Sequence, residues 1–333
     1  MTAKADLVES VLSGKRLALA RLLTLIENNA PDGQAAMDRL FSHTGRAHLI
    51  GVTGSPGSGK SSLVNQIALA LRNPKADQPA RSVAIVAVDP SSPFTGGAVL
   101  GDRVRMRDLA GDQGIFIRSM ASRGALGGLA RATAGVVQAL DAAGFDVVLV
   151  ETVGAGQSEV DIARLAHTTL VIEAPGMGDD IQAIKAGILE IADVLVINKA
   201  DHPGADSTLR ALRAMLELGH PSHRAPSGSS TPLWIPPVLQ TIATKAEGIL
   251  EVVEAIDAHA RHLRETGAWQ LRDRSRLLAE LEMLVQFELN AQWRAALPPE
   301  ALASALESLE NRQMSPYQAA KRLTSLQSEA VVH

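Results

Sequence analysis

The sequence contains no cysteine, and aromatic residues make up only 3% of its 333 residues, with a single tyrosine among them. The absence of cysteine excludes a disulfide framework, a thiolate zinc site, an iron–sulfur cluster and a cysteine nucleophile. The scarcity of aromatic residues argues against a stacking platform for single-stranded nucleic acid. No run approaches the roughly 20 consecutive apolar residues that a membrane-spanning helix needs. These absences favour an ordinary globular protein.

The charge of the chain is not strongly biased to one sign. Lysine and arginine number 32 against 36 acidic residues, which gives a formal net charge of −4. A mildly acidic chain is a poor candidate for general binding to nucleic acid or to an anionic membrane. The first residues hold no apolar run of the signal-peptide type. We therefore expect a cytoplasmic protein that binds neither nucleic acid nor membrane.

Short apolar runs rich in valine and isoleucine recur between residues 47 and 257. Because these runs are continuous and not alternating, they predict strands buried on both faces of a parallel sheet. Amphipathic segments separate them, which predicts an α/β fold with a mainly parallel sheet flanked by helices. The expected strands are 49–52, 83–88, 115–117, 147–150, 170–172, 194–197 and, more weakly, 234–238, and the expected helices between them are 62–72, 126–143, 181–192 and 207–218.

Helical patterns continue on both sides of this region. Residues 6–29 and 34–43 show helical spacing of apolar residues, whereas residues 272–295 contain no proline or glycine and predict one long amphipathic helix. Two shorter helices are expected at about 300–310 and 316–327. The sequence thus predicts three parts: an N-terminal helical extension (1–46), an α/β domain (47–257) and a C-terminal helical segment (258–333).

A phosphate-binding motif follows the first expected strand. Residues 54–61, here called the P-loop, match G-x-x-x-x-G-K-[ST] between a strand and a helix, which is the context that the motif requires. Its glycines let backbone N–H groups point inward, and the helix N-terminus adds partial positive charge. We expect Lys60 to reach the β- and γ-phosphates and the Ser61 hydroxyl to bind Mg²⁺. The predicted phosphate site comprises Gly54, Ser55, Pro56, Gly57, Ser58, Gly59, Lys60, Ser61 and Ser62.

Acidic residues are expected on the metal side of this site. Glu151 ends a buried strand and is followed closely by glycine, which is a Walker-B arrangement. Asp89 ends another expected strand, and Asp102 lies in a glycine-rich loop that can fold over the phosphates. An Asp-Pro turn and a solvated loop acid are the alternative interpretations of these two aspartates. The predicted metal-side residues are Ser61, Asp89, Asp102 and Glu151.

An N-K-x-D sequence, residues 198–201, closes a further expected strand. The Asp201 carboxylate can accept two hydrogen bonds from N1–H and the N2 amino group of guanine, and adenine offers no such pair of donors. A site built for that pair rejects adenine, since the acid is then left unpaired. The segment 241–243, here called the guanine loop, can offer a backbone N–H to the guanine oxygen. We expect GTP and GDP to be bound by Asn198, Lys199, Asp201, Thr241 and Ala243.

Together these segments resemble the SIMIBI class of P-loop GTPases and, within it, the MeaB/MMAA/ArgK group, with MeaB as the nearest match. A glutamate in Walker B is the distinguishing mark of that branch. In the guanine loop Ile242 stands where the group usually has serine, which is a departure from the pattern. The likeness covers nearly the whole chain and rests on residues 54–62, 89–94, 101–106, 151–159 and 198–201.

The resemblance implies a GTPase chaperone of a cobalamin-dependent acyl-CoA mutase, such as methylmalonyl-CoA mutase. In such proteins GTP hydrolysis gates adenosylcobalamin delivery and protects the mutase. The resemblance also implies a homodimer held by the C-terminal helices, so that 47–257 is the G domain and 258–333 the dimerisation arm. The segment from Glu173 through Gln182 and Lys185 resembles a third switch that couples partner docking to the nucleotide. Ordinary helix-surface roles for Gln182 and Lys185 are the alternative.

Cobalamin itself is expected in the partner and not in this chain. The sequence has no Asp-x-His-x-x-Gly motif, and its nearest run, residues 257–262, lacks the glycine. Because that run falls in a helical pattern, we expect its histidines on the helix surface. Which acyl-CoA mutase is the partner stays open among the methylmalonyl-, ethylmalonyl- and isobutyryl-CoA enzymes.

The expected reaction is attack of water on the γ-phosphate of GTP, in which the protein mainly positions groups and neutralises charge. No general base is obvious, although Gln157 is placed to orient water. An arginine finger is open between the partner, Arg105 and Arg123.

Three alternatives stand against this function. An ATP-dependent kinase linked to amino-acid transport needs a preference for ATP, against which N-K-x-D speaks. A nickel or cobalt metallochaperone GTPase usually carries Cys/His clusters, which the zero cysteine count opposes. A non-enzymatic scaffold would need an inactive P-loop, whereas Lys60, Ser61 and Glu151 are all present.

Overall fold

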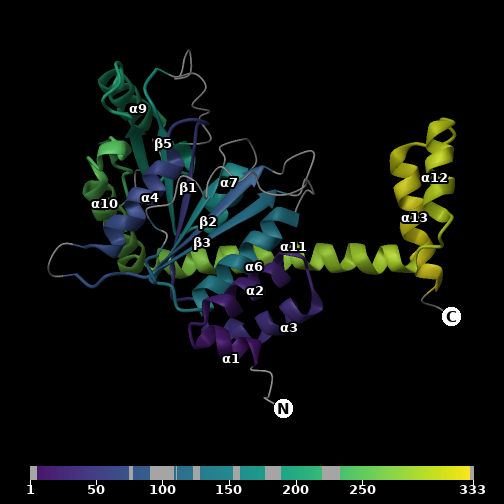
Figure 1. The fold of residues 1–333 in the computed structure, drawn as a ribbon. Coiled ribbons are helices and arrows are strands. Elements are labelled where there is room, and N and C mark those ends of the chain that lie inside the picture. Colours follow the sequence, from purple (N-terminus) through teal and green to yellow (C-terminus); the bar gives the residue numbers. More distant parts are fainter. Residues whose placement is uncertain are drawn as a thin grey trace. The chain divides into compact units, whose positions relative to one another are not determined.

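A computed structural model of the chain describes residues 6–74, 78–90, 109, 111–122, 128–152, 158–176, 189–219 and 233–330. Within these residues, seven parallel strands form one sheet in the order β3-β2-β4-β1-β5-β6-β7 (Figure 1). The predicted fold class, a mainly parallel sheet flanked by helices, is confirmed. The strands are β1 (His48–Gly54), β2 (Val83–Pro90), β3 (Ile115–Ser122), β4 (Val147–Thr152), β5 (Thr168–Glu173), β6 (Val194–Asn198) and β7 (Val238–Thr241).

Six strands lie where continuous valine- and isoleucine-rich runs predict them, and the seventh is displaced. The weak run at 234–238 gives only the start of β7, which extends from Val238 to Thr241. Pro236 and Pro237 precede it. Because proline has no backbone N–H to donate to a ladder, pairing with β6 begins only after these two residues.

Helices cover both faces of the sheet. Figure 1 shows α4 and α10 on one side and α2 and α6 on the other. Alternate residues of β1 follow the same division, since Ile50 packs with α4 and α10 whereas Leu49 packs with α2 and α6. The described helices are α1 (Leu7–Leu12), α2 (Arg16–Glu27), α3 (Pro31–Leu40), α4 (Lys60–Arg72), α6 (Gly128–Ala142), α7 (Ser158–Leu165), α9 (Ala205–Gly219), α10 (Ile249–Glu265), α11 (Ala268–Ala296), α12 (Ala301–Glu310) and α13 (Pro316–Ala330). None of these helices combines the length and the apolar character needed to cross a membrane.

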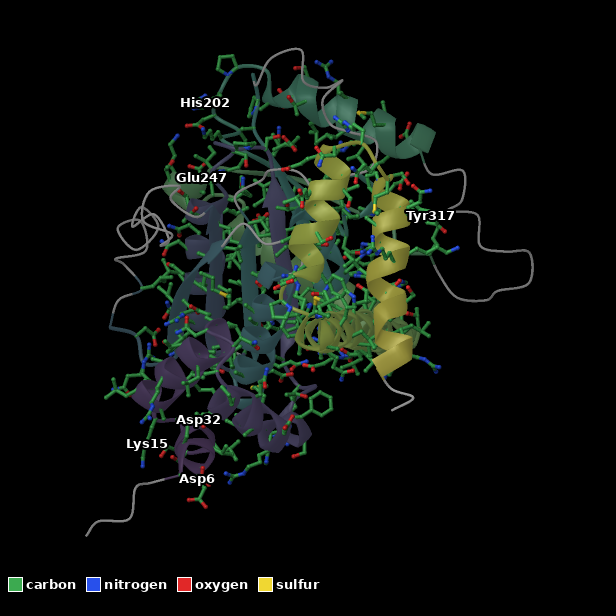
Figure 2. All side chains as sticks on the ribbon, turned by 90° about the vertical axis from the view of Figure 1, so that its right-hand side faces the viewer. Asp6, Lys15, Asp32, His202, Glu247 and Tyr317 are labelled. Atoms are coloured by element: carbon green, nitrogen blue, oxygen red, sulfur yellow. The ribbon has the colours of Figure 1, made fainter. Side chains whose placement is uncertain are left out.

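The N-terminal helical pattern splits into separate helices at residues that break it. Asp6, labelled in Figure 2, caps α1 by accepting a hydrogen bond from the backbone N–H of Val8 at 2.9 Å. Gly14 adopts φ +77° between α1 and α2, and Pro31 opens α3. The buried residues of these helices join the core on the α6 side of the sheet. The expected N-terminal helices therefore cover one face of the sheet.

The described parts of the chain fall into two compact units, residues 1–276 and 277–333. The two units divide after residue 276 and not at residue 258, where the sequence predicts the start of the C-terminal segment. The reason is that α10 packs against α4 and against strands of the sheet. The second unit, residues 277–333, contains most of α11 together with α12 and α13, in agreement with the expected long helix and two shorter ones. The proposed roles of the three predicted parts stay predictions.

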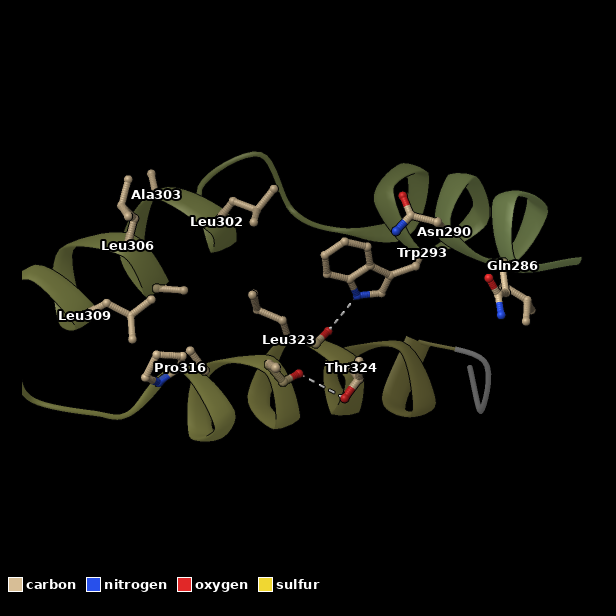
Figure 3. A pocket seen from close by; sticks show the side chains of 14 residues that line it. Gln286, Asn290, Trp293, Leu302, Ala303, Leu306, Leu309, Pro316, Leu323 and Thr324 are labelled. Carbon is tan, nitrogen blue, oxygen red and sulfur yellow. Dashed lines mark hydrogen bonds between the residues drawn. The ribbon is translucent and has the colours of Figure 1, made fainter. Parts of the chain in front are cut away.

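The second unit contains an open apolar pocket of about 890 Å³ (Figure 3). Trp293 crosses from α11 to α13, where its indole N–H donates to the carbonyl of Leu323 at 3.2 Å. Leu302, Leu306 and Leu309 of α12 line the same pocket. Tyr317, labelled in Figure 2, is 73% exposed. Apolar side chains are thus left uncovered on this unit.

A buried polar network lies at the amino ends of β1, β5 and β6. His259 of α10, only 1% exposed, and His48 both hydrogen-bond the Thr168 hydroxyl, at 2.9 and 2.8 Å. The expectation that the histidines of residues 257–262 lie on the helix surface is therefore wrong for His259. It occupies the same buried face of α10 as Val252 and Ile256, at helical spacing.

Residues in the first turns of α11 form hydrogen bonds with the same network. Arg272 donates two hydrogen bonds of 2.8 Å to the Asp193 carboxylate. The Nε2 atom of His167 lies 2.9 Å from the Asp273 carboxylate, and its Nδ1 atom accepts the backbone N–H of Leu49 at 3.0 Å. Because Nδ1 is an acceptor, the proton of His167 resides on Nε2 and the ring is neutral.

We expect the free energy of unfolding to fall as the pH drops from about 6.5 towards 4. Burial lowers the pKa of His259 to about 4, and burial also lowers the pKa of His48 and of His167. The folded chain keeps these rings neutral while the unfolded chain binds protons, so stability is fully present above pH 6.5 and is lost below it. For His259 alone the shift corresponds to about 3 kcal/mol.

Urea denaturation at pH 7.5, 6.0 and 5.0 measures this loss. Substituting the exposed His202 by glutamine is the matched control, and we expect it to leave the pH dependence unchanged. An unfolding free energy that is equal at pH 7.5 and 5.0 would contradict the prediction.

Candidate functional site

Because the seven described strands are parallel, their carboxyl ends lie at one edge of the sheet, which is where ligands of open α/β sheets bind. β1 leads into the P-loop, β4 carries Glu151, and β6 leads into the N-K-x-D segment. Figure 2 labels His202 and Glu247 at this edge, far from Asp6 and Asp32 of the N-terminal helices. The structure therefore brings the predicted phosphate, metal and base segments together.

The P-loop takes a path that its glycines alone permit. Gly54 has φ +132°, and a Cβ atom there would collide with the backbone of Ile172 in β5. Gly59 has φ +90°, and a Cβ atom there would collide with the side-chain amide of Asn198. The chain then enters α4 directly at Lys60. The loop thus curls against the neighbouring strands and presents the N-terminus of α4 at its open side.

Lys60 is buried within this loop. Its ammonium group donates hydrogen bonds to the carbonyls of Gly54 and Ser55, both at 2.9 Å. These are neutral acceptors, and phosphate oxygens would bind the same ammonium group more strongly because they are charged. The position of Lys60 therefore suits binding of a polyphosphate in the P-loop.

Two of the predicted metal-side residues, Ser61 and Glu151, contact each other. The Ser61 hydroxyl donates to the buried Glu151 carboxylate at 2.6 Å. A hydroxyl and a carboxylate in contact are hard oxygen donors, which fit Mg²⁺. No group of three or more His, Asp or Glu that could hold a metal occurs in the described part of the chain.

Asn198 connects the P-loop to the guanine loop. Its side-chain NH₂ donates to the carbonyl of Ser58 at 2.8 Å, and its side-chain oxygen accepts from the Thr241 hydroxyl at 3.2 Å and from the N–H of Ala243 at 3.1 Å. The residue is buried, and Lys199 after it has φ +57°. Asn198 therefore holds the phosphate and base segments in a fixed relation.

Asp201 lies at the surface of this edge. Its side chain is 38% exposed, and one carboxylate oxygen lies 3.4 Å from the Lys245 ammonium group. In the guanine loop, the N–H of Ile242 donates to the carbonyl of Glu247 at 3.1 Å. Since the N–H of Ala243 already donates to Asn198, a guanine oxygen would have to displace one of these acceptors. The role of the guanine loop towards the base stays a prediction.

Several predicted residues fall outside what the structure describes. Asp89 is the penultimate residue of β2 and lies two residues beyond Ala87, the register partner of Glu151, but its side chain is not described. Six further residues of the predicted site lie outside the described part of the chain, so their roles stay predictions. They are Asp102, Arg105, Arg123, Gln157, Gln182 and Lys185. Most of the helix expected at 181–192 also lies outside it.

One contact in the site has no counterpart in the sequence motifs. Glu173, at the end of β5, accepts a hydrogen bond from the Ser55 hydroxyl at 2.6 Å. The sequence resemblance places this glutamate only at the start of a switch segment. The sequence signal for this contact is that Glu173 is an acid at the carboxyl end of an apolar run. The carboxyl ends of parallel strands lie at the same edge of the sheet, and the P-loop begins at that edge.

The family model described as "Methylmalonyl Co-A mutase-associated GTPase MeaB" matches residues 19–297. The chain belongs to the MeaB family. It is a GTPase of this family, as the motifs and the resemblance predicted, and membership accounts for the combination of a P-loop, a Walker-B glutamate and N-K-x-D.

Relatives across the family carry related names. A protein of Pyrococcus abyssi named as a GTPase is 41% identical over 315 residues, which cover 95% of this chain and 94% of that protein. GTPase ArgK of Escherichia coli is 39% identical, with 81% of each chain covered. The "Methylmalonic aciduria type A homolog, mitochondrial" of Caenorhabditis elegans is 31% identical over a region that covers 80% of this chain and 68% of that protein.

The fold also has a solved counterpart. The crystal structure of a protein named "LAO/AO transport system kinase" superposes with a TM-score of 0.67 at 28% identity and covers 97% of both chains. The shared architecture therefore extends over nearly the whole chain.

Proposed function

We propose that this GTPase is a chaperone of a cobalamin-dependent acyl-CoA mutase of the methylmalonyl-CoA mutase type. In this function GTP hydrolysis gates adenosylcobalamin delivery and protects the mutase. The observation that carries the proposal is the family match over residues 19–297, whose description names association with methylmalonyl-CoA mutase. The name of the Caenorhabditis elegans relative points to the same metabolism. Cobalamin belongs to the partner in this proposal.

The site supports hydrolysis through positioning and charge neutralisation. The P-loop N–H groups and Lys60 bind the β- and γ-phosphates, and Asp201 binds the guanine edge. Ser61 and Glu151 hold Mg²⁺, with Asp89 and Asp102 on the same side. The metal supplies neutralisation of the charge on the phosphate oxygens. Gln157 orients the attacking water in this proposal.

The proposal includes a homodimer formed through the C-terminal helices. In the second unit, Leu281 of α11 and Leu306 of α12 are both more than half exposed, and the apolar pocket in Figure 3 opens beside α12. Apolar surface of this kind commonly marks a protein–protein interface. A second copy of the chain would cover it. We place the protein in the cytoplasm.

A second candidate function is an ATP-dependent kinase linked to amino-acid transport. It is favoured by the name of one solved relative, the LAO/AO transport system kinase, which is 28% identical. The two functions differ in nucleotide, because Asp201 fits the paired donors of guanine and not adenine. Competition of GTP against ATP for the site distinguishes them.

We expect slow GTP hydrolysis by the protein alone and faster hydrolysis in the presence of its mutase. The sequence motifs identify no general base and no definite arginine finger, so we expect turnover well below the roughly 1–100 per second of kinases. Phosphate release is measured with and without methylmalonyl-, ethylmalonyl- and isobutyryl-CoA mutase, and the mutase that stimulates hydrolysis is the partner. An unrelated CoA enzyme is the control. Tens of turnovers per second without a partner, or no stimulation by any of the three mutases, would contradict the proposal.

A further inference from the structure

The P-loop is held from both sides by carboxylates among the described residues. On the β4 side, Glu151 accepts the Ser61 hydroxyl, and on the β5 side, Glu173 accepts the Ser55 hydroxyl, both at 2.6 Å. Glu173 is 6% exposed, and its neighbour Ile172 is the register partner of Gly54 in β1. The strand order therefore fixes Glu173 directly beside the first turn of the loop.

Ser55 contacts Lys60 directly through its backbone carbonyl. The Ser55 carbonyl is one of the two backbone acceptors of the Lys60 ammonium group, and the other is the adjacent Gly54 carbonyl. Gly54 and Gly57 on either side of Ser55 have φ angles of +132° and +77°, which residues other than glycine rarely adopt, and neither glycine has a side chain to hold this turn. The Ser55 side chain is thus the point at which the neighbouring strand can fix the two carbonyls on which Lys60 rests.

We propose that Glu173 is a positioning residue for GTP hydrolysis. Its carboxylate holds Ser55, and through Ser55 it sets where the Lys60 ammonium group meets the β- and γ-phosphates. The inference rests on the proposed phosphate-binding role of Lys60. An ionised acceptor makes a shorter and stronger hydrogen bond than a neutral one, which suits a fixed anchor. Misplacement of a catalytic group by about 1 Å is enough to cost up to roughly 100-fold in rate.

The base segment has a separate connection to the loop. Asn198 holds the carbonyl of Ser58 and does not contact Ser55 in the described hydrogen bonds. Loss of the Glu173–Ser55 contact should therefore reduce the rate of the chemical step while leaving the affinity for guanine nucleotides nearly unchanged. A purely structural role of Glu173 would lower both together with the melting temperature.

The test compares Ser55→Ala, Glu173→Ala, Glu173→Gln and the Ser55→Ala/Glu173→Ala double variant of the full chain. Single-turnover GTP hydrolysis, KM, GDP affinity and melting temperature are measured for each. We expect kcat to fall about tenfold or more in either alanine variant, with GDP affinity changed less than threefold. The double variant should be no slower than the single ones, because both remove one contact. Glu173→Gln should retain most of the rate, since its amide oxygen still accepts the Ser55 proton.

Ser82→Ala is the matched control. The Ser82 hydroxyl donates to the Asp146 carboxylate at 2.8 Å, a contact of the same type at the amino edge of the sheet. We expect this variant to keep the wild-type kcat. Wild-type rates in Ser55→Ala and Glu173→Ala would overturn the positioning role alone, and so would a fall in kcat matched by equal losses of GDP affinity and thermal stability. No GTP hydrolysis by the wild-type protein would overturn the proposed site chemistry and the positioning role with it.

Discussion

Replacement of Lys60 by alanine is expected to lower GTP hydrolysis by a factor of about 10³. Lys60 is the cation that the fold buries inside the P-loop, where it rests on the Gly54 and Ser55 carbonyls. Charge builds up on the phosphate oxygens during transfer, and a fixed cation in a site shielded from water stabilises that charge strongly. Alanine provides neither the charge nor a hydrogen-bond donor.

Phosphate release under single-turnover conditions measures this loss. Lys60→Gln separates charge from folding, because its amide can still donate to the loop carbonyls, and we expect it to be as inactive as the alanine variant. The exposed Lys15, which lies beside the N-terminal helices in Figure 2, gives the control Lys15→Ala with an unchanged rate. Hydrolysis by Lys60→Gln within tenfold of the wild type would contradict the charge argument.

The sheet could be predicted because its strands are buried on both faces, so that Val83–Val88 and Val194–Ile197 are continuous apolar runs. The start of the edge strand β7 and the burial of His259 are harder to predict from the sequence. β7 starts late because Pro236 and Pro237 cannot pair. The polarity of His259 favours a surface position, although the residue continues the buried helical spacing of Val252 and Ile256. The polar neighbours that make burial of a histidine tolerable come from other strands and are not encoded near it.

The candidate site was predictable where a motif fixes the backbone and not where distant side chains meet. The P-loop glycines and the Walker-B strand place Lys60, Ser61 and Glu151 by local rules. The Ser55–Glu173 contact joins residues 118 positions apart, and it depends on β5 lying beside β1. Strand order is a property of the whole sheet, so the acid at the end of the apolar run 170–172 does not by itself show that Ser55 is its partner.

Asp201→Asn is expected to weaken binding of guanine nucleotides by about 100-fold or more while leaving binding of adenine nucleotides nearly unchanged. Hydrogen bonds to a charged group contribute about 1.5–3 kcal/mol each, and guanine offers two donors to this carboxylate. The amide of asparagine directs N–H groups at those donors. Xanthine carries an oxygen in place of the 2-amino group, so the variant should gain affinity for xanthine nucleotides.

Equilibrium titration with fluorescent GDP, ADP and xanthosine diphosphate measures this change in specificity. Asp201 also lies 3.4 Å from Lys245, and Lys245→Ala is the matched control because it removes that ion pair and retains the carboxylate. Since the pair is solvent-exposed and contributes at most about 1 kcal/mol, we expect Lys245→Ala to change GDP affinity less than fivefold. Equal losses for guanine and adenine nucleotides in Asp201→Asn would remove the basis for guanine selectivity and leave the ATP-dependent kinase as the better function. Loss of GDP affinity in Lys245→Ala as large as in Asp201→Asn would instead show that loop structure, and not base recognition, accounts for the effect.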